Sequence, residues 1–154
     1  MSKAFGIVNF AGNHIQVDGL QAYRPVGAFS FLGRYRTIDF PISNMSNSGI
    51  DNIQVYVRRK PRSLTEHLGT GRHYNINSKR GQLNIMYTEN NRIGDIYSTD
   101  VAAYIENMNC IERIHLPYVV IAPSYMIYTA DYSTFLSEHI ESGADISIMY
   151  HSVD

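Results

Sequence analysis

The sequence predicts an α/β fold built on a doubly wound, mostly parallel sheet. Short apolar runs typical of buried strands alternate along the whole chain with segments that carry apolar residues at helical spacing. The chain has 154 residues, of which 44% are hydrophobic and 18% charged, which is the composition of one globular domain. Because each strand is followed by a helix, consecutive strands are expected to run parallel and to pair through helical crossovers.

The expected strands share β-branched or continuous apolar sequence and lie at 3–10, 52–57, 82–87, 117–122 and 145–150. The run 117–122 (PYVVIA) is apolar throughout, which predicts a strand covered on both faces. The segment 145–150 (DISIMY) is expected to be the last strand, with no closing helix after it. The sheet is therefore expected to be truncated, and the chain to be part of a longer protein.

The expected helices lie at 37–48, 61–68, 99–111 and 131–142. Pro41 fits the first turn of the first helix, and Gly49 suits the residue after its end. The last helix has Asp131 as its expected N-cap and Gly143 as its stop. Its buried stripe is expected to comprise Tyr132, Phe135, Leu136 and Ile140.

Charge and composition exclude several classes of protein. The net charge of −1 gives no general attraction to nucleic acid or to an anionic membrane, and no targeting segment or membrane span is visible. The single cysteine, Cys110, cannot form an intramolecular disulfide, so we expect a cytoplasmic protein. The six histidines show no metal-ligand spacing, which argues against a zinc site.

Three stretches together carry a resemblance to a known family, and one of them is the first strand, which ends where a loop is expected. The segment Gly33–Gly49 reads GRYRTIDFPISNMSNSG, and His139–Ile146 reads HIESGADI. They resemble glucose-1-phosphate adenylyltransferase, which makes ADP-glucose from ATP and glucose 1-phosphate for glycogen or starch. The resemblance implies a Rossmann-like sheet of the nucleotide-diphospho-sugar transferase type. It also implies that residues 1–154 are the N-terminal part of the nucleotidyltransferase domain, without the β-helix domain that follows in the family.

The phosphate-binding positions implied by the resemblance have changed. The family's first strand leads into a GGxGxRL loop, in which glycines let the backbone approach the triphosphate and an arginine neutralises its charge. Aligned without gaps, this loop includes Ala11, His14 and Gln16 here. The family's phosphate-binding lysine, in a Lys-Pro-Ala motif, corresponds to Val26, and Arg24 lies two residues before it.

The metal-binding and sugar-side positions have changed as well. The family's Ser-Gly-Asp-His motif holds Mg²⁺ through its aspartate, and this aspartate and histidine correspond to Tyr125 and Met126. A tyrosine is a poor ligand for a hard cation that prefers carboxylates. The acidic residue of the family's Gly-Thr-Ala-Asp-Ala motif corresponds to Val101. We therefore expect no catalytic residue, metal or cofactor in this chain.

The loss of four separate elements predicts a regulatory, non-catalytic subunit that forms a hetero-oligomer with a catalytic adenylyltransferase subunit, for which Mg²⁺ is expected. One alternative is an active enzyme with a remodelled phosphate loop, in which Arg24 replaces the lysine and Asp100 or another acid holds Mg²⁺. Another is a sensor that binds a sugar phosphate or a nucleotide sugar without turnover.

A basic segment offers candidate sites for such an anionic effector. Seven lysines or arginines between positions 58 and 80 accompany a single acid, Glu66, which indicates either a solvated face or an anion site. The candidate anion-binding residues are Arg24, Arg58, Arg59, Lys60 and Arg62. Within the segment Gly33–Gly49, Asp39 is expected to brace its helix and pair with an arginine, Arg34 or Arg36, although a residual ligand role stays open.

Overall fold

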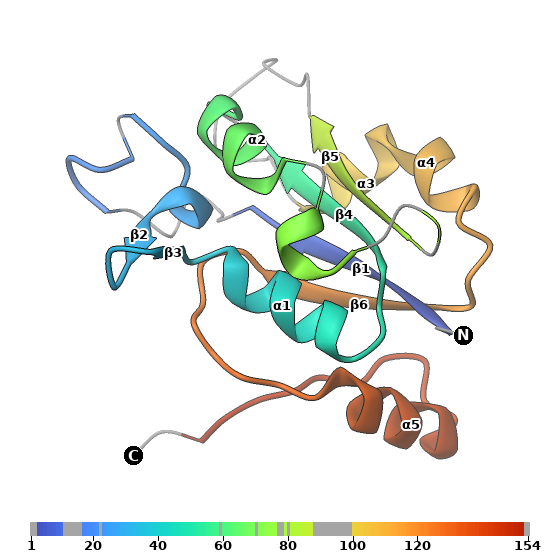
Figure 1. Cartoon of the computed structure of the whole chain (residues 1–154). Coiled ribbons are helices and arrows are strands. Elements are labelled where there is room, and N and C mark those ends of the chain that lie inside the picture. The colour runs from blue at the N-terminus through green and yellow to red at the C-terminus, as the bar shows by residue number, and fades with distance from the viewer. Residues whose placement is uncertain are drawn as a thin grey trace.

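A computed structural model shows a four-stranded parallel sheet with helices on both faces (Figure 1). It describes residues 3–10, 17–21, 23–58, 60–69, 71–76, 79, 81–87 and 100–152. The strand order is β5-β4-β1-β6, and the strands comprise β1 (Ala4–Asn9), β4 (Asn52–Val57), β5 (Gln82–Tyr87) and β6 (Tyr118–Pro123). These four strands confirm the predicted doubly wound, parallel α/β fold. A separate two-stranded hairpin, β2 (Ser30–Phe31) and β3 (Tyr35–Arg36), was not foreseen.

The first face of the sheet packs against α1 (Asp39–Asn47) and α2 (Arg62–Leu68). Ile42 and Met45 of α1 are fully buried with Val8 and Val55 of the sheet. Gly6 of β1 allows this close packing, because a β-carbon there would overlap the sulfur of Met45. Gly49 follows α1 with φ of +76°, as expected of a residue after a helix end.

The second face packs against α3 (Asp100–Glu106) and α4 (Met108–Glu112), which Figure 1 shows behind the sheet. Their core contains Phe5, Ile7, Tyr56, Met86 and Ala103. The sequence predicted a single helix over 99–111, and this is wrong. The helix is interrupted at Asn107, whose φ of −107° and ψ of 19° are not helical, and whose side chain donates a hydrogen bond to the Ala103 carbonyl at 3.0 Å.

The last helix, α5 (Tyr132–Ser142), lies beyond the β6 edge (Figure 1). Asp131 is its N-cap and accepts a hydrogen bond from the Ser133 N–H at 2.9 Å, while Gly143 ends it with φ of +64°. Both predictions are confirmed. Of the predicted stripe, Tyr132 is buried, whereas Phe135, Leu136 and Ile140 are only half-buried. No described helix combines the length and the apolar character needed to cross a bilayer.

Two expectations at the β6 side of the sheet are wrong. The segment 145–150 forms no strand; it runs beside α5, where Ser147 Oγ lies 2.8 Å from His139 Nδ1, and its Ile146 and Ile148 are exposed. A strand needs a neighbouring edge to hydrogen-bond to, and a sequence pattern does not supply one. Nor is β6 covered on both faces, because it pairs only with β1 and leaves Val119 44% and Ile121 49% exposed.

Candidate functional site

The carboxyl ends of the parallel strands meet at one edge of the sheet, and Asn9, the last residue of β1, lies at its centre. The Asn9 carbonyl accepts a hydrogen bond from the Ser124 N–H at 3.0 Å, just after β6. Its side-chain amide donates to Asp100 Oδ2 at 2.9 Å, at the start of α3, and its side-chain oxygen accepts from the Tyr104 hydroxyl. One residue therefore holds together the ends of β1 and β6 and the start of α3. Such edges are where α/β sheets usually bind ligands.

A short helical turn, η1 (Val26–Ala28), closes the same edge against β6. A β-carbon built on Gly27 would lie 3.2 Å from Cβ and 3.3 Å from Oγ of the buried Ser124, so the two backbones approach closely. Hydrogen bonds tie η1 to the segment before α1: Thr37 Oγ1 donates to the Val26 carbonyl at 2.9 Å, and the Ile38 N–H donates to the Gly27 carbonyl at 3.1 Å.

Three of the four elements that the sequence marked as changed therefore adjoin one another. Val26 lies in η1 and is only 7% exposed, so no cationic group projects from this position. Tyr125 is half-buried and Met126 is 53% exposed, directly after Ser124. Val101, the residue after Asp100, is 58% exposed. The fourth element, with Ala11, His14 and Gln16, lies outside the described residues, as does Arg59 of the basic set.

The two residues that follow Ser124 do not suit Mg²⁺. Tyr125 and Met126 stand where the resemblance places an aspartate and a histidine, and neither side chain is a ligand that a hard divalent cation prefers. Across the part of the chain that the structure describes, no three His, Cys, Asp or Glu side chains gather in a way that could hold a metal ion. Asp100 places a carboxylate at this edge, and the Asn9 amide binds it.

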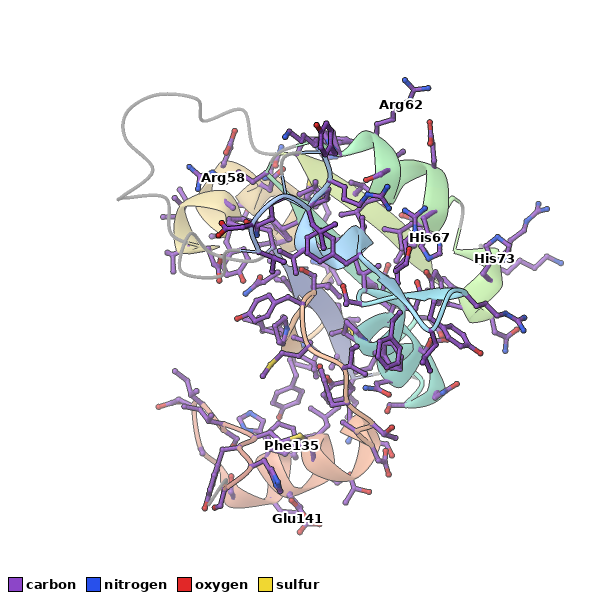
Figure 2. The ribbon with its side chains drawn as sticks, turned by 90° about the vertical axis from the view of Figure 1, so that its left-hand side faces the viewer. Arg58, Arg62, His67, His73, Phe135 and Glu141 are labelled. Carbon is purple, nitrogen blue, oxygen red and sulfur yellow. The ribbon has the colours of Figure 1, made fainter. Side chains whose placement is uncertain are left out.

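The candidate anion-binding residues that the structure describes do not converge on one point. Arg62 extends away from the molecule and pairs with Glu66 at 2.8 Å, a bond that raises the pKa of Arg62 (Figure 2). Lys60 Nζ instead donates to the Gln21 carbonyl at 3.3 Å, which brings the start of α2 to the loop that contains Arg24. Arg58 lies apart from Arg62 in Figure 2. Among the described candidates, Arg24 and Lys60 thus belong to adjoining segments.

A polar cluster around Asp39 was only partly foreseen. Asp39 braces the start of α1 as predicted, because its Oδ2 accepts the Arg36 backbone N–H at 2.8 Å. The prediction that it pairs with an arginine side chain is wrong: Oδ1 lies 2.6 Å from His67 Nε2 and accepts the Tyr74 hydroxyl at 2.6 Å. Burial and the bond to Asp39 raise the pKa of Tyr74, so its hydroxyl remains a donor. Sequence spacing cannot show this contact, because His67 and Tyr74 lie far along the chain from Asp39.

A second polar group, beneath α3 and α4, gave no sequence signal. The rings of Tyr56 and Tyr104 meet edge to face with centroids 5.1 Å apart, and the Tyr56 hydroxyl donates to Gln54 Oε1 at 3.0 Å. Burial raises the pKa of Tyr56 to about 12, and burial followed by the charge of Asp100 raises that of Tyr104. Both hydroxyls therefore stay protonated and hold α3 against β1 and β4.

Comparisons with known proteins identify the family of the chain. The family model for nucleotidyl transferases matches residues 5–154. The chain is 30% identical, over 97% of its length, to the glycogen biosynthesis protein GlgD of Geobacillus stearothermophilus, of which it covers 44%. It is 36% identical, over 79% of its length, to the glucose-1-phosphate adenylyltransferase of Clostridioides difficile, of which it covers 32%. The chain thus spans less than half the length of these relatives.

A solved structure supports the fold. The crystal structure of a Bacillus anthracis protein assigned as a glucose-1-phosphate thymidylyltransferase superposes with a TM-score of 0.69 over 90% of this chain and 50% of that one. The two sequences are 14% identical, so the likeness concerns the fold alone.

Proposed function

The chain belongs to the nucleotidyl transferase family, and we propose that it is a non-catalytic, regulatory subunit that acts in glycogen synthesis in the cytoplasm. Its partner would be a catalytic glucose-1-phosphate adenylyltransferase subunit, which binds Mg²⁺ and forms ADP-glucose from ATP and glucose 1-phosphate. The relatives named GlgD and glucose-1-phosphate adenylyltransferase support this pathway.

One observation carries the proposal: the changed positions form a continuous edge. Val26 is buried where the resemblance places a phosphate-binding lysine, and Tyr125 takes the place of the metal-binding aspartate. The turn that contains Val26 packs directly on Ser124, the residue before Tyr125. Phosphoryl and nucleotidyl transfer depend on cations that stabilise developing negative charge. An edge with these residues lacks those cations, which usually make the largest contribution to catalysis.

The regulatory effect would be a shift in population. A subunit that binds one conformation of its partner more tightly than another favours that conformation. The difference between the two binding free energies sets how far the subunit can change the partner's response to effectors. The family fold that this chain retains offers the partner a related surface to bind. Because its changed edge would not bind substrate, the chain would not compete with the catalytic subunit for it.

An assay of pyrophosphate release tests the proposal. The chain alone, with ATP, glucose 1-phosphate and Mg²⁺, should show no turnover, whereas adding it to the catalytic subunit should raise that subunit's rate or its sensitivity to effectors. A catalytic subunit mixed with bovine serum albumin controls for nonspecific stabilisation. Turnover by the chain alone at about 1 per second or faster, the range typical of enzymes, would refute the proposal.

The alternative of an active enzyme is favoured by one observation: Asp100 places a carboxylate at the same edge, bound to Asn9. If Asp100 held Mg²⁺, the variant Asp100→Asn would abolish any Mg²⁺-dependent binding of ATP. The matched substitution Glu112→Gln, on the exposed side of α4, removes the same charge away from Asn9 and should leave binding unchanged. Loss in the first variant alone would support the enzyme.

An effector site is favoured by the contact of Lys60 with the loop that contains Arg24. Charge reversal at both residues, Arg24→Glu with Lys60→Glu, should then abolish binding of glucose 6-phosphate as a probe. The double reversal Arg113→Glu with Lys79→Glu serves as the matched control, because those two residues lie outside this contact.

A further inference from the structure

The connection between β6 and α5 runs from Ser124 to Asp131 and passes α1 on its way (Figure 1). It begins at the candidate edge, where Ser124 is buried and Met126 is exposed, and it ends at the N-cap of α5. The described residues 126–131 form neither helix nor strand, so no regular backbone pattern fixes their path. Their position therefore depends on contacts with other parts of the fold.

Two polar residues of α1 supply such contacts. Asn44 Nδ2 donates to the Tyr128 carbonyl at 2.9 Å, in the middle of the connection. Asn44 is only 7% exposed, so this amide needs a partner within the protein. Ser48, the C-cap residue of α1, accepts the Tyr132 N–H on its Oγ at 2.9 Å, at the start of α5. The helix α1 thus holds the connection both in its middle and at its far end.

The Ser48 hydroxyl serves the ends of two helices at once. It donates to the Asn44 carbonyl at 2.7 Å, in the last turn of α1, and it accepts the N–H of Tyr132, the first residue of α5. The last carbonyls and the first N–H groups of a helix lack partners within that helix. Asp131 caps the next N–H of α5, that of Ser133, and leaves the Tyr132 N–H to Ser48. A single side chain therefore joins the end of α1 to the start of α5.

Further contacts fix both ends of the connection. The hydroxyls of Tyr128 and Tyr132 lie 2.6 Å apart, and burial raises the pKa of both, so both stay protonated and one donates to the other. At the candidate edge, the Ser124 N–H donates to the Asn9 carbonyl at 3.0 Å. The backbone is thus held at Ser124, Tyr128 and Tyr132, and the edge residues that follow Ser124 lie between the first two of these points.

We propose that Asn44 and Ser48 are positioning residues, which clip the β6–α5 connection onto α1 and thereby fix Tyr125 and Met126 at the candidate edge. The two residues belong to the segment Gly33–Gly49, to which the proposed function gives no role. The clip also couples the edge to the start of α5, because one short connection carries both and a short stretch of backbone has limited reach. This inference goes beyond the proposed function and applies to an active or an inactive edge.

Hydrogen exchange measured at single amides by NMR tests the positioning. The Ser124 N–H is bonded to Asn9 and not to either residue of the clip. In Asn44→Ala it should exchange about fivefold faster than in the native chain, the factor that one neutral hydrogen bond contributes to a local opening. The Val55 N–H in β4 should keep its rate. The control Asn47→Ala, at an exposed position of the same helix, should change neither amide.

A second variant and a second probe keep the test decisive. If Asn44→Ala does not fold, Ser48→Ala removes the other contact at a half-buried position and is measured in the same way. The sequence has no tryptophan, so Tyr125→Trp places a single indole at the edge. In that background Ser48→Ala should shift the emission to longer wavelength, and Asn47→Ala should not.

Three results would overturn the clip: an unchanged exchange rate at Ser124, an acceleration shared with the amides of β4, or an indole emission that Ser48→Ala leaves unchanged. A shared acceleration would mean that the substitution destabilises the whole fold and positions nothing. Neither measurement includes substrate or a partner subunit, so failure of the clip is distinguishable from failure of the proposed function.

Discussion

The contact between Gly27 and Ser124 predicts a strong coupling between two substitutions. In Gly27→Ala, the new methyl group would lie 3.2 Å from Ser124 Cβ and 3.3 Å from its Oγ, and 3.5 Å from Ile38 Cβ. The first two distances are tighter than ordinary packing, and Ser124 is buried, so it cannot move freely. Overpacking of this kind costs about 1 kcal/mol at its mild end.

Ser124→Gly removes both of the close atoms. In that background Gly27→Ala should be neutral, or stabilising by roughly 0.4–1 kcal/mol, because alanine restricts the unfolded chain more than glycine does. The two effects differ by about 1–2 kcal/mol, which corresponds to roughly 2–8 °C in Tm for a domain of this size. Thermal and urea unfolding of the four proteins of the cycle would measure the coupling. Equal effects of Gly27→Ala in the two backgrounds would show that η1 does not pack on the end of β6.

Two further substitutions test local features of the fold. Hydrogen bonds from Ser133 and Thr134 lower the pKa of Asp131 from 3.8 to about 2, so its contribution to stability is present above pH 4 and is lost as the pH falls toward 2. The difference in unfolding midpoint between the native chain and Asp131→Ala should therefore shrink between pH 4 and pH 2, and a constant difference would contradict the cap. Tyr56→Phe removes a buried hydrogen bond to Gln54 and should cost about 1 kcal/mol in urea unfolding. Spectrophotometric titration of the native chain should also show a tyrosine that ionises near pH 12 and is missing from this variant.

Local sequence signals predicted the sheet because each strand and helix cap depends on neighbouring residues. The strand 52–57 and the caps Asp131 and Gly143 are examples, since β-branched sequence and capping chemistry act within a few residues. The same signals failed at 145–150, where alternation of apolar residues indicates a strand only if another strand is available to pair with it. The break at Asn107 was missed because a side chain that bonds its own backbone leaves the apolar spacing unchanged.

The candidate site was predictable in its composition and not in its geometry. The resemblance marked Val26, Val101 and Tyr125 from three distant segments. It could not show that Asn9 joins α3 to the end of β6, because that contact depends on the sheet register and on a polar residue without any motif. For the same reason the partners of Asp39, which follow it by 28 and 35 positions, emerge only from the packing of α2 and of the short helical turn η2 (Arg72–Tyr74) on α1.

Val26 is buried at the position where the resemblance places a phosphate-binding lysine. A lysine at a position that is 7% exposed would lose most of its hydration, and a buried ammonium without a partner is strongly disfavoured. The close approach of Gly27 to Ser124 leaves little space for the turn to shift toward β6 and make room for a larger side chain. The apolar residue at Val26 and the packing of η1 on β6 therefore support each other. Under the proposed function, the absence of a cation at this position follows from the packing of the edge, and Val26→Lys should destabilise the fold without restoring catalysis.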